Sequence, residues 1–478
     1  MSDASANLAR VRDTAFAELD APAPAFTSAL VAILSGQVAS GAVTLLTEIT
    51  YARLLGPAAR GVISLCLMSV AFGALVGGLG CEAVIVYWAA RSKNNVSSWI
   101  PAVSFWGGLG CVASAGLWIL GYWQLRLPIF RGISPGSARA VLVTIPAAVL
   151  FAFTMALASG TEQFRMRSAC AALRQIAGLA TFLLFLALLG RNANAALWGN
   201  FVGLIAGSLV ALSLLRESVQ QFSRLDGAFE HLGPTLSYGL RGQIGNLATF
   251  FNYRLDVFVV NYFLDSTQLG LYALGVVISE ALWQIPQAVA SALFPRTART
   301  IERDAKQFTC LVLRQTLLVT SACGLAVALF SPVMIPLIFG RRFAASVAVI
   351  WWILPGTTAL SLAKVACADL AGRGKNGYSS AAAFICFAMT AGLDWYLIPR
   401  MGITGAALAS SAAYFVDALL ILAALRYEMD VSWKRLLIPT RDDARMYRAY
   451  WLRLRSLLRF GAPTVGLNTH AASSRECD

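Results

Sequence analysis

The sequence predicts an all-α polytopic membrane protein with about twelve transmembrane helices, arranged as two six-helix parallel repeats around a central cavity. Composition is the first reason: of 478 residues, 58% are hydrophobic and only 13% are charged, and the mean hydropathy is +0.67. A water-soluble protein of this size cannot hide so much apolar surface from water. The other two reasons are the spacing of the apolar runs and a match between the two halves of the chain.

Apolar runs long enough to cross a bilayer recur along the chain, because about 20 apolar residues span the hydrocarbon core. The runs of the first half lie near residues 27–52, 61–90, 98–122, 138–158, 168–189 and 194–215. Those of the second half lie near residues 236–263, 269–294, 308–336, 346–370, 378–399 and 402–425. We therefore expect two groups with equal numbers of spans.

The two groups repeat one another at a distance of about 210 residues. A Leu that precedes a Gly by six positions occurs at 55–61 and again at 264–270, and Ala-Ala-Leu occurs at 195–197 and again at 406–408. An even number of spans per group brings both groups into the membrane from the same side, which makes the repeat parallel. Repeats of this kind usually form their binding site between the halves, near the middle of the membrane.

These boundaries divide the chain into five expected parts. They are a cytoplasmic N-terminal tail (1–26), an N-terminal six-helix bundle (27–215), a cytoplasmic linker (216–235), a C-terminal six-helix bundle (236–425) and a basic cytoplasmic C-terminal tail (426–478). Arg10 and Arg12 precede the first span and ten Lys and Arg follow the last, so the positive-inside rule places both termini in the cytoplasm. In the C-terminal tail, arginines lie opposite Tyr447, Trp451 and Leu454 on a helix. This pattern predicts an amphipathic helix that lies on anionic membrane lipids, or one that packs on the protein's own loops.

The residue inventory argues against an enzyme, a metal protein and a nucleic-acid-binding protein. His231 and His470 are the only histidines and the cysteines show no CxxC spacing, so no metal site is expected. The sequence has no phosphate-binding P-loop and shows no catalytic constellation. The formal net charge of +14 agrees with an excess of basic residues in cytoplasmic segments, so no nucleic acid partner is expected.

Charged residues inside the spans give the strongest indication of function, since a charge at the middle of a membrane costs about 2.5–3.5 kcal/mol on insertion scales. Arg174, Arg241, Arg314 and Lys364 each lie about six residues from the cytoplasmic end of a span, and we expect them to gather near its inner mouth. Each of them alone could extend to lipid headgroups. Together they suit an anionic headgroup, because guanidinium groups bind phosphate through two hydrogen bonds.

Arg254 lies deeper in its span, and Asp256 follows about 200° further round the helix, so we expect the two side chains to have different partners. Glu280, in the next span, lies at a compatible depth to pair with the arginine. Such a pair is either structural, or Arg254 contacts substrate while Asp256 or Glu280 takes up a proton or releases the arginine. Glu82 is a further candidate for a coupling or gating carboxylate. The coupling ion would be H⁺ or Na⁺, and no other cofactor is expected.

A set of segments, in their order and spacing, resembles one known family. The segments are 52–61 (ARLLGPAARG), 252–256 (NYRLD), 261–264 (NYFL), 270–272 (GLY), 284–296 (QIPQAVASALFPR), 370–375 (LAGRGK) and 398–407 (IPRMGITGAA). They are similar to bacterial oligosaccharide flippases, the polysaccharide-transporter branch of the multidrug/oligosaccharidyl-lipid/polysaccharide exporter superfamily. The resemblance covers about residues 26–425.

The resemblance implies a cation-lined cavity between two bundles in the bacterial cytoplasmic (inner) membrane. It implies a flippase that moves a polyprenyl-diphosphate-linked oligosaccharide, the repeat unit of a surface polysaccharide, from the inner to the outer face by alternating access. Arginines of the cavity would meet the diphosphate or acidic sugars, at Arg254 and Arg241 of this chain. A polysaccharide polymerase and glycosyltransferases are the implied protein partners. Asp394 stands where that branch more often has an uncharged polar residue, which leaves its role open.

Two other functions are weighed against this one. A drug or organic-cation antiporter of the same superfamily would have an acidic or apolar cavity, whereas the basic residues inside the spans favour an anionic substrate. A membrane-bound sugar-lipid polymerase or glycosyltransferase would need a large loop outside the membrane with carboxylate or histidine chemistry. The longest interior loop, 216–235, is too short for that.

Overall fold

The computed structural model describes residues 22–91, 99–216, 232–297 and 302–438, and within these ranges it contains helices and no strands. Ten helical segments of the described residues are long and apolar enough to cross a membrane. One of these segments lies in α2 (Pro22–Gly78), which joins the first two predicted spans. The seventh predicted span is α9 (Leu232–Phe263), whose charges lower its hydropathy. The predicted all-α fold with twelve spans is therefore confirmed.

The remaining elements follow the predicted spans in order. In the first half they are α3 (Cys81–Arg91), α4 (Ile100–Ile119), the π-helical turn η2 (Leu120–Gln124), the 3-10 turn η3 (Pro128–Phe130), α5 (Pro135–Gly160), α6 (Phe164–Leu189) and α7 (Ala193–Leu214). In the second half they are α10 (Ser266–Glu280), η4 (Ala281–Trp283), α11 (Gln284–Thr297), α12 (Glu302–Ile338), η5 (Arg341–Phe343), α13 (Ser346–Gly372), α14 (Gly377–Met401), α15 (Ile403–Met429) and α16 (Trp433–Leu437).

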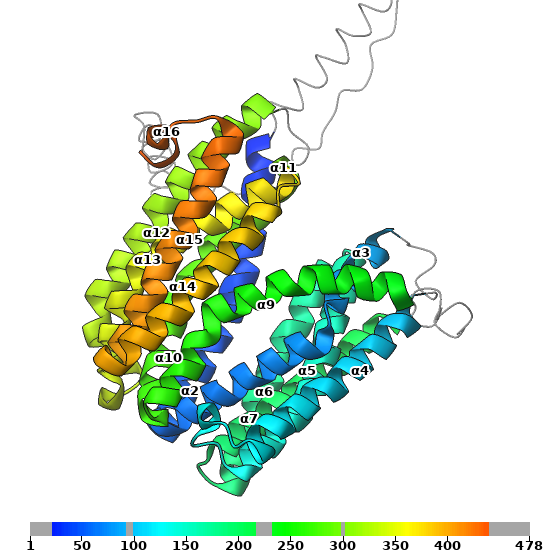
Figure 1. Cartoon of the computed structure of the whole chain (residues 1–478), viewed down its shortest axis with the longest axis vertical. Helices are drawn as coiled ribbons and strands as arrows, with labels where there is room; N and C mark the ends of the chain where they lie inside the picture. Colours follow the sequence, from blue (N-terminus) through cyan, green and yellow to red (C-terminus); the bar gives the residue numbers. More distant parts are fainter. Residues whose placement is uncertain (1–21, 92–98, 217–231, 298–301, 439–478) are drawn as a thin grey trace, which may run out of the picture.

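Figure 1 shows two helical bundles, one holding α3 to α7 and the other holding α12 to α15. They lie closest where α10 begins, and they diverge toward the end of the molecule that holds α16 and α3 (Figure 1). The diverging end also contains the start of α2, and the sequence predicts that it faces the cytoplasm. We call it the inner end, and the opposite end, where α10 begins, the outer end.

At the outer end, the two halves meet through a pair of glycines. A Cβ atom on Gly61 of α2 would lie 1.8 Å from the backbone oxygen of Ser266, and one on Gly270 of α10 would lie 2.0 Å from that of Pro57. Small residues allow helix backbones to approach closely inside a membrane. Gly61 and Gly270 end the matching Leu-to-Gly segments of the repeat, so the same sequence feature in each half makes this contact.

A second contact of the halves involves Arg53. Its guanidinium Nε donates to the carbonyl oxygen of Ile338 at 2.7 Å, and its Nη2 donates to that of Leu337. These carbonyls are in the last turn of α12, where helix acceptors lack a partner within the helix and a cation is favourable. Arg53 thus joins the turn between the first two spans to the second half.

This turn is a sharp break within α2. Gly56 adopts φ 80° and ψ 179°, which favours glycine, and Pro57 begins the second span without an N–H to donate. An ion pair of 2.7 Å between Arg60 Nη2 and Glu48 Oε2 crosses the break. The segment 52–61 therefore forms a sharp turn between two helical parts of α2, and the buried ion pair stabilises this turn.

The helix α9 passes from the first bundle to the second (Figure 1). Near its start, the carbonyl oxygen of Leu232 accepts from Trp106 Nε1 at 3.0 Å, and Gln243 donates to the carbonyl of Leu75 in α2. Further along, Asn252 Oδ1 accepts from Thr390 Oγ1 of α14 at 3.1 Å. α9 therefore connects the bundles along its length. It also carries Arg254 and Asp256.

The eighth span is broken in its middle, between α10 and α11. The helix α10 ends at Glu280, and η4 follows before α11 begins at Gln284. Pro286 has no N–H to bond to the carbonyl of Leu282, and its ring crowds that carbonyl, which favours a break in the α-helix at this point. The break leaves the carboxylate of Glu280 at a helix junction inside the second half.

The predictions for residues 1–21 and 439–478, and thus for most of the basic C-terminal tail, lie outside the described residues, as does most of the linker 216–235. Of the tail, the structure describes the end of α15 and the short helix α16, whose first turn is capped by the Ser432 hydroxyl. The division of the chain into five parts stays a prediction.

Candidate functional site

The centre of the candidate site is an ion pair between α9 and α10. Arg254 Nη1 and Nη2 donate to Glu280 Oε1 and Oε2 at 2.8 and 2.9 Å, so the guanidinium binds the carboxylate with both of its terminal nitrogens. The two side chains remain 27% and 14% exposed. Paired groups with this geometry are held firmly, yet a competing anion can still reach the arginine.

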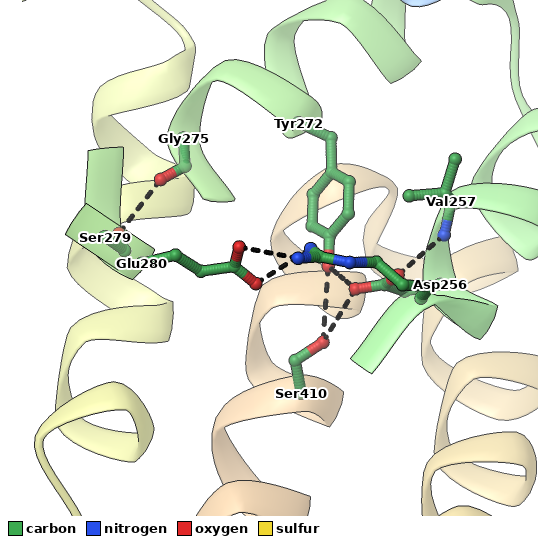
Figure 2. Close-up of polar contacts among 8 residues, drawn as sticks. Asp256, Val257, Tyr272, Gly275, Ser279, Glu280 and Ser410 are labelled. Atoms are coloured by element: carbon green, nitrogen blue, oxygen red, sulfur yellow. Dashed lines mark hydrogen bonds and ion pairs between the residues drawn. The ribbon is translucent and has the colours of Figure 1, made fainter. Parts of the chain in front are cut away.

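Asp256 has different partners from Arg254, as their positions on the helix predict. Asp256 Oδ2 accepts from the Tyr272 hydroxyl and from Ser410 Oγ, the latter at 3.3 Å, and Oδ1 accepts from the Val257 backbone N–H at 2.7 Å. Figure 2 shows Asp256, Tyr272 and Ser410 together, with Glu280 at the end of α10, about two turns beyond Tyr272. The buried carboxylate therefore links α9 to α10 and α15.

Lys364 lies close to this pair, on α13. Its ammonium group lies 4.4 Å from the ring centre of Trp283 and 5.3 Å from that of Tyr253. Cation–π contacts of this kind stabilise an ammonium group against the faces of aromatic rings. Glu280 and Asp417 are near enough to attract the ammonium group, and Arg254 near enough to repel it.

A cavity of about 520 Å³ opens beside Lys364 within the second half. Its lining includes Asn252 and Tyr253 of α9, Gln287 of α11, Lys364 of α13 and Asp417 of α15. Cavities of a few hundred cubic ångströms with a few placed polar groups are typical of ligand sites. The charged residues of its wall are one cation, Lys364, and one carboxylate, Asp417.

Asp394 of α14 is the most unusual buried group near the site. It is fully buried, and neither of its carboxylate oxygens has a hydrogen-bond partner among the described residues. It lies within electrostatic range of Asp256. An isolated carboxylate is very costly in a low-dielectric interior, so a proton or a cation has to balance its charge.

The structure places the other predicted residues in different surroundings. Arg174 of α6 donates to Asn200 Oδ1 at 3.2 Å and lies 5.4 Å from the ring centre of Phe151, in the first bundle. Arg314 of α12 is buried, and it donates to the carbonyl of Arg435 in α16 at 2.7 Å.

The last two predicted residues are exposed: Arg241 on α9 and Glu82 on α3. The four cations that the sequence places near one mouth therefore do not share one set of partners. Lys364 lies in electrostatic range of Arg254, and the roles of all four stay predictions.

Sequence reasoning missed the neutral partners of the network. Tyr272, Ser410 and Trp283 carry no charge, and an aromatic or a serine in an apolar span gives no signal by itself. Their positions opposite charged residues became apparent only when the helices were packed. Asp394 is recognisable in the sequence as a charged residue in an apolar span. That it lies near Asp256 could not be inferred from sequence spacing. As for metals, no group of three His, Cys, Asp or Glu in the described ranges is placed to bind one.

Comparison with known proteins gives a family and a fold. Residues 50–348 match the model of a family described as polysaccharide biosynthesis protein. The probable low-salt glycan biosynthesis flippase Agl15 of Haloferax volcanii is 22% identical over 236 residues, which are 48% of this chain and 49% of that protein. The chain thus spans about half the length of the curated relative it matches.

Among solved structures, the fold is similar to that of the lipid II flippase MurJ in an inward closed conformation, with a TM-score of 0.71 and 15% identity over 91% of this chain and 94% of that one. It is also similar to an inward-facing MATE multidrug transporter, with a TM-score of 0.61 and 15% identity over 84% and 98% of the chains. The eukaryotic MATE transporter AtDTX14 gives a TM-score of 0.59 and 16% identity over 89% and 98%. At this identity the similarity concerns the fold alone.

Proposed function

Because the chain belongs to the polysaccharide biosynthesis protein family, we propose that it is a flippase that moves a polyprenyl-diphosphate-linked oligosaccharide across the bacterial cytoplasmic membrane, from the inner to the outer face. Both termini lie in the cytoplasm in this proposal. The observation that carries it is the partly exposed pair of Arg254 and Glu280, with Lys364 near it, inside a membrane-spanning bundle. A diphosphate is the part of such a substrate that these cations recognise.

In the proposed mechanism, the diphosphate takes the place of Glu280 on Arg254. Both terminal nitrogens of the guanidinium are occupied by the carboxylate in this conformation, so substrate binding has to break a two-bond contact. A phosphate group likewise offers two acceptor oxygens to the guanidinium, and a diphosphate carries a larger charge than a carboxylate. Lys364 supplies a second cation, and the break after Glu280 lets that residue withdraw with η4. Binding at this junction of α9 and α10 can therefore bias the arrangement of the two bundles.

We further propose that the coupling ion, H⁺ or Na⁺, acts on the carboxylates of the second half. Asp256 and Asp394 are both buried and near each other, and the unpartnered oxygens of Asp394 are free to receive a proton or a cation. A proton on Glu280 would release Arg254 directly. The exposed position of Glu82 on α3 makes it the least favoured of the candidates.

The alternative is a drug or organic-cation antiporter, since MATE transporters share the fold. Asp256, Asp394 and Asp417 would be its substrate carboxylates. Asp256 is already bonded to Tyr272 and Ser410, however, and a cationic substrate in the cavity would meet Lys364, which has Arg254 within electrostatic range. The charge balance of the accessible groups thus favours an anionic substrate.

The test is transport by the purified protein in liposomes. A fluorescent prenyl-diphosphate-linked disaccharide is incorporated, and its arrival in the opposite leaflet is measured with and without a proton or sodium gradient. Ethidium uptake is measured on the same vesicles. We expect flipping of the lipid-linked sugar and no ethidium transport. The opposite pattern would show an antiporter and overturn the proposal.

The proposed partners follow from this role. The product would be used by a polysaccharide polymerase, and glycosyltransferases would supply the substrate. Anionic lipids would hold the basic C-terminal tail at the inner surface. The contact of the tail with anionic lipids is tested by copurification. The amount of anionic lipid that copurifies with the full chain is compared with the amount that copurifies with a chain ending after α16.

A further inference from the structure

A second candidate site extends inward from the outer end, where two cavities adjoin, and the smaller cavity reaches Phe72 and Phe251. One has a volume of about 410 Å³ and the other of about 830 Å³. They share Phe130 of η3 and Tyr262 of α9 as a common wall. Neither cavity contains Arg254, Glu280 or Lys364, so this region is separate from the site described above.

The smaller cavity is apolar and is built by both halves of the chain. Phe72 of α2 and Trp118 of α4 line it from the first half, and Phe251 and Phe258 of α9 and Trp395 of α14 line it from the second. The polar groups of Trp118 and Ser69 are bonded elsewhere. Trp118 Nε1 donates to the carbonyl of Ala138 at 3.1 Å, and Ser69 Oγ donates to that of Leu65 at 2.8 Å. Apart from Tyr262, the walls therefore offer hydrocarbon and aromatic surface to an occupant.

The larger cavity is lined by aromatic and cationic side chains from the connection between α4 and α5. Tyr122, Trp123, Arg126 and Arg131 all contribute. Both arginines are exposed, and neither forms an ion pair within the described part of the chain. Aromatic faces suit sugar rings, and two free guanidinium groups suit a doubly charged phosphate group.

The connection that carries these arginines is held in place. Tyr122 donates its hydroxyl hydrogen to the carbonyl of Ile133 at 3.0 Å. From the other half, Asn261 Nδ2 donates to the carbonyls of Ile129 and Arg131 at 2.9 and 3.0 Å. Arg126 adopts φ 48°, an uncommon backbone conformation for a residue with a side chain. A segment fixed in this way presents its arginines in a defined position relative to the apolar cavity.

We propose that the two cavities form one exit site for a prenyl diphosphate lipid. The prenyl chain occupies the apolar cavity, and the diphosphate with its first sugars occupies the larger one, next to Arg126 and Arg131. The inference rests on the proposed function and adds to it a second binding site, for the translocated lipid. An apolar slot that joins a cationic pocket fits an anionic amphiphile better than a neutral lipid or a free sugar. Since both halves build the apolar slot, their rearrangement would change its shape and release the chain.

The experiment is photo-crosslinking of the full-length protein in nanodiscs of phosphatidylethanolamine and phosphatidylglycerol. The probe is undecaprenyl diphosphate with a diazirine in its chain, and crosslinked peptides are identified by mass spectrometry. Undecaprenol with the same diazirine and diazirine-labelled phosphatidylglycerol are the two comparison probes. We expect the diphosphate probe to label peptides of η3 and the end of α9, and to do so more strongly than either comparison probe.

Two variants test the two parts of the site. Val259→Trp fills the apolar cavity, and we expect labelling there to fall about tenfold or more, because the chain is excluded. Its control, Val333→Trp on the 66% exposed position of α12, should leave labelling unchanged.

R126Q/R131Q removes the cations, and the diphosphate probe should lose about tenfold or more in affinity while undecaprenol loses none. Its control is Arg139→Gln, an exposed residue that donates to its own helix.

The outcomes separate this inference from the proposed function. Labelling around Arg254 with none at the outer cavities overturns the exit site and leaves the flippase proposal standing. Equal labelling by phosphatidylglycerol, with no effect of R126Q/R131Q, shows bulk lipid in the cavity and also overturns the exit site. Absence of labelling at both places overturns both proposals.

Discussion

Where the second half of the chain pairs Arg254 of α9 with Glu280 of α10, the first half has apolar side chains at the corresponding places in its own first two spans. If Gly61 and Gly270 are taken as equivalent, the network residues Arg254, Asp256, Tyr272 and Glu280 correspond to Leu45, Thr47, Ile63 and Ala71. The glycines themselves are alike in both sequence and contact. The repeat therefore preserves how the halves pack, while the membrane-embedded ion pair next to the cavity belongs to one half.

The first half does contain an ion pair, and its surroundings differ. Glu48 and Arg60 belong to the two segments of α2 on either side of Gly56, and Arg60 is almost fully buried. Arg60 also donates to Ser64 on the next turn of its own helix. This pair stabilises the turn within α2, whereas the pair of Arg254 and Glu280 lies in electrostatic range of Lys364, which lines a cavity. The comparison agrees with the proposal that the second half contains the groups that respond to substrate, while the ion pair of the first half stabilises the turn within α2.

The largest effect is expected from breaking the pair in the second half. In Arg254→Met, two charge-assisted hydrogen bonds to the diphosphate are lost, each worth about 1.5–3 kcal/mol, so export should fall about 100-fold or more. The matched change at the equivalent place, Leu45→Met, should leave export within about twofold, since volume-conserving swaps cost little. Export of surface polysaccharide by cells that lack the native copy is the measurement.

A double variant separates binding from folding. Removing one partner of a buried pair leaves an uncompensated charge and costs about 3–5 kcal/mol, whereas removing both avoids that penalty. R254M/E280M should therefore regain the thermal stability that Arg254→Met loses, and still fail to export. Restored export in the double variant would show that the pair is only structural.

The next largest effect concerns the contact that both halves share. In Gly270→Ala, the new methyl group would lie 2.0 Å from the backbone oxygen of Pro57, which cannot move away as a side chain can. We expect a loss of about 2 kcal/mol or more in the free energy of unfolding, and a similar loss for Gly61→Ala. Thermal unfolding in detergent is the measurement. Gly242→Ala in α9, where a Cβ meets no atom within 4 Å, is the control and should not lose stability.

A smaller effect is expected from Asp394→Asn. The amide keeps the shape of the side chain and removes the charge that a proton or a cation has to balance. We expect transport in liposomes to lose its dependence on the ion gradient and to slow about tenfold, an effect on rate of about 1.4 kcal/mol. Asp430→Asn, at the exposed end of α15, is the control. A variant that still responds fully to the gradient would exclude Asp394 from coupling.

The smallest effect is expected at Arg53. Arg53→Gln loses the two hydrogen bonds to the last turn of α12, and the free energy of unfolding should fall by about 1 kcal/mol, because the site is exposed. The thermal midpoint measures this, with Arg400→Gln as the control, since Arg400 bonds within its own helix. An unchanged midpoint for Arg53→Gln would leave Gly61 and Gly270 as the main contact of the halves.

The sequence by itself determined the twelve spans, the parallel repeat, the glycines of the matching segments and the depth of each charge. Depth can be counted along a helix, at 1.5 Å per residue, so Glu280 was correctly expected as the partner of Arg254. Only the tertiary structure decided which way each helix turns its charges and which helix lies beside it. Arg174 and Arg314 have the depth of Lys364, yet they bond to Asn200 and to the Arg435 carbonyl instead. Position across the membrane follows from the order of residues, whereas position within its plane follows from how the helices pack.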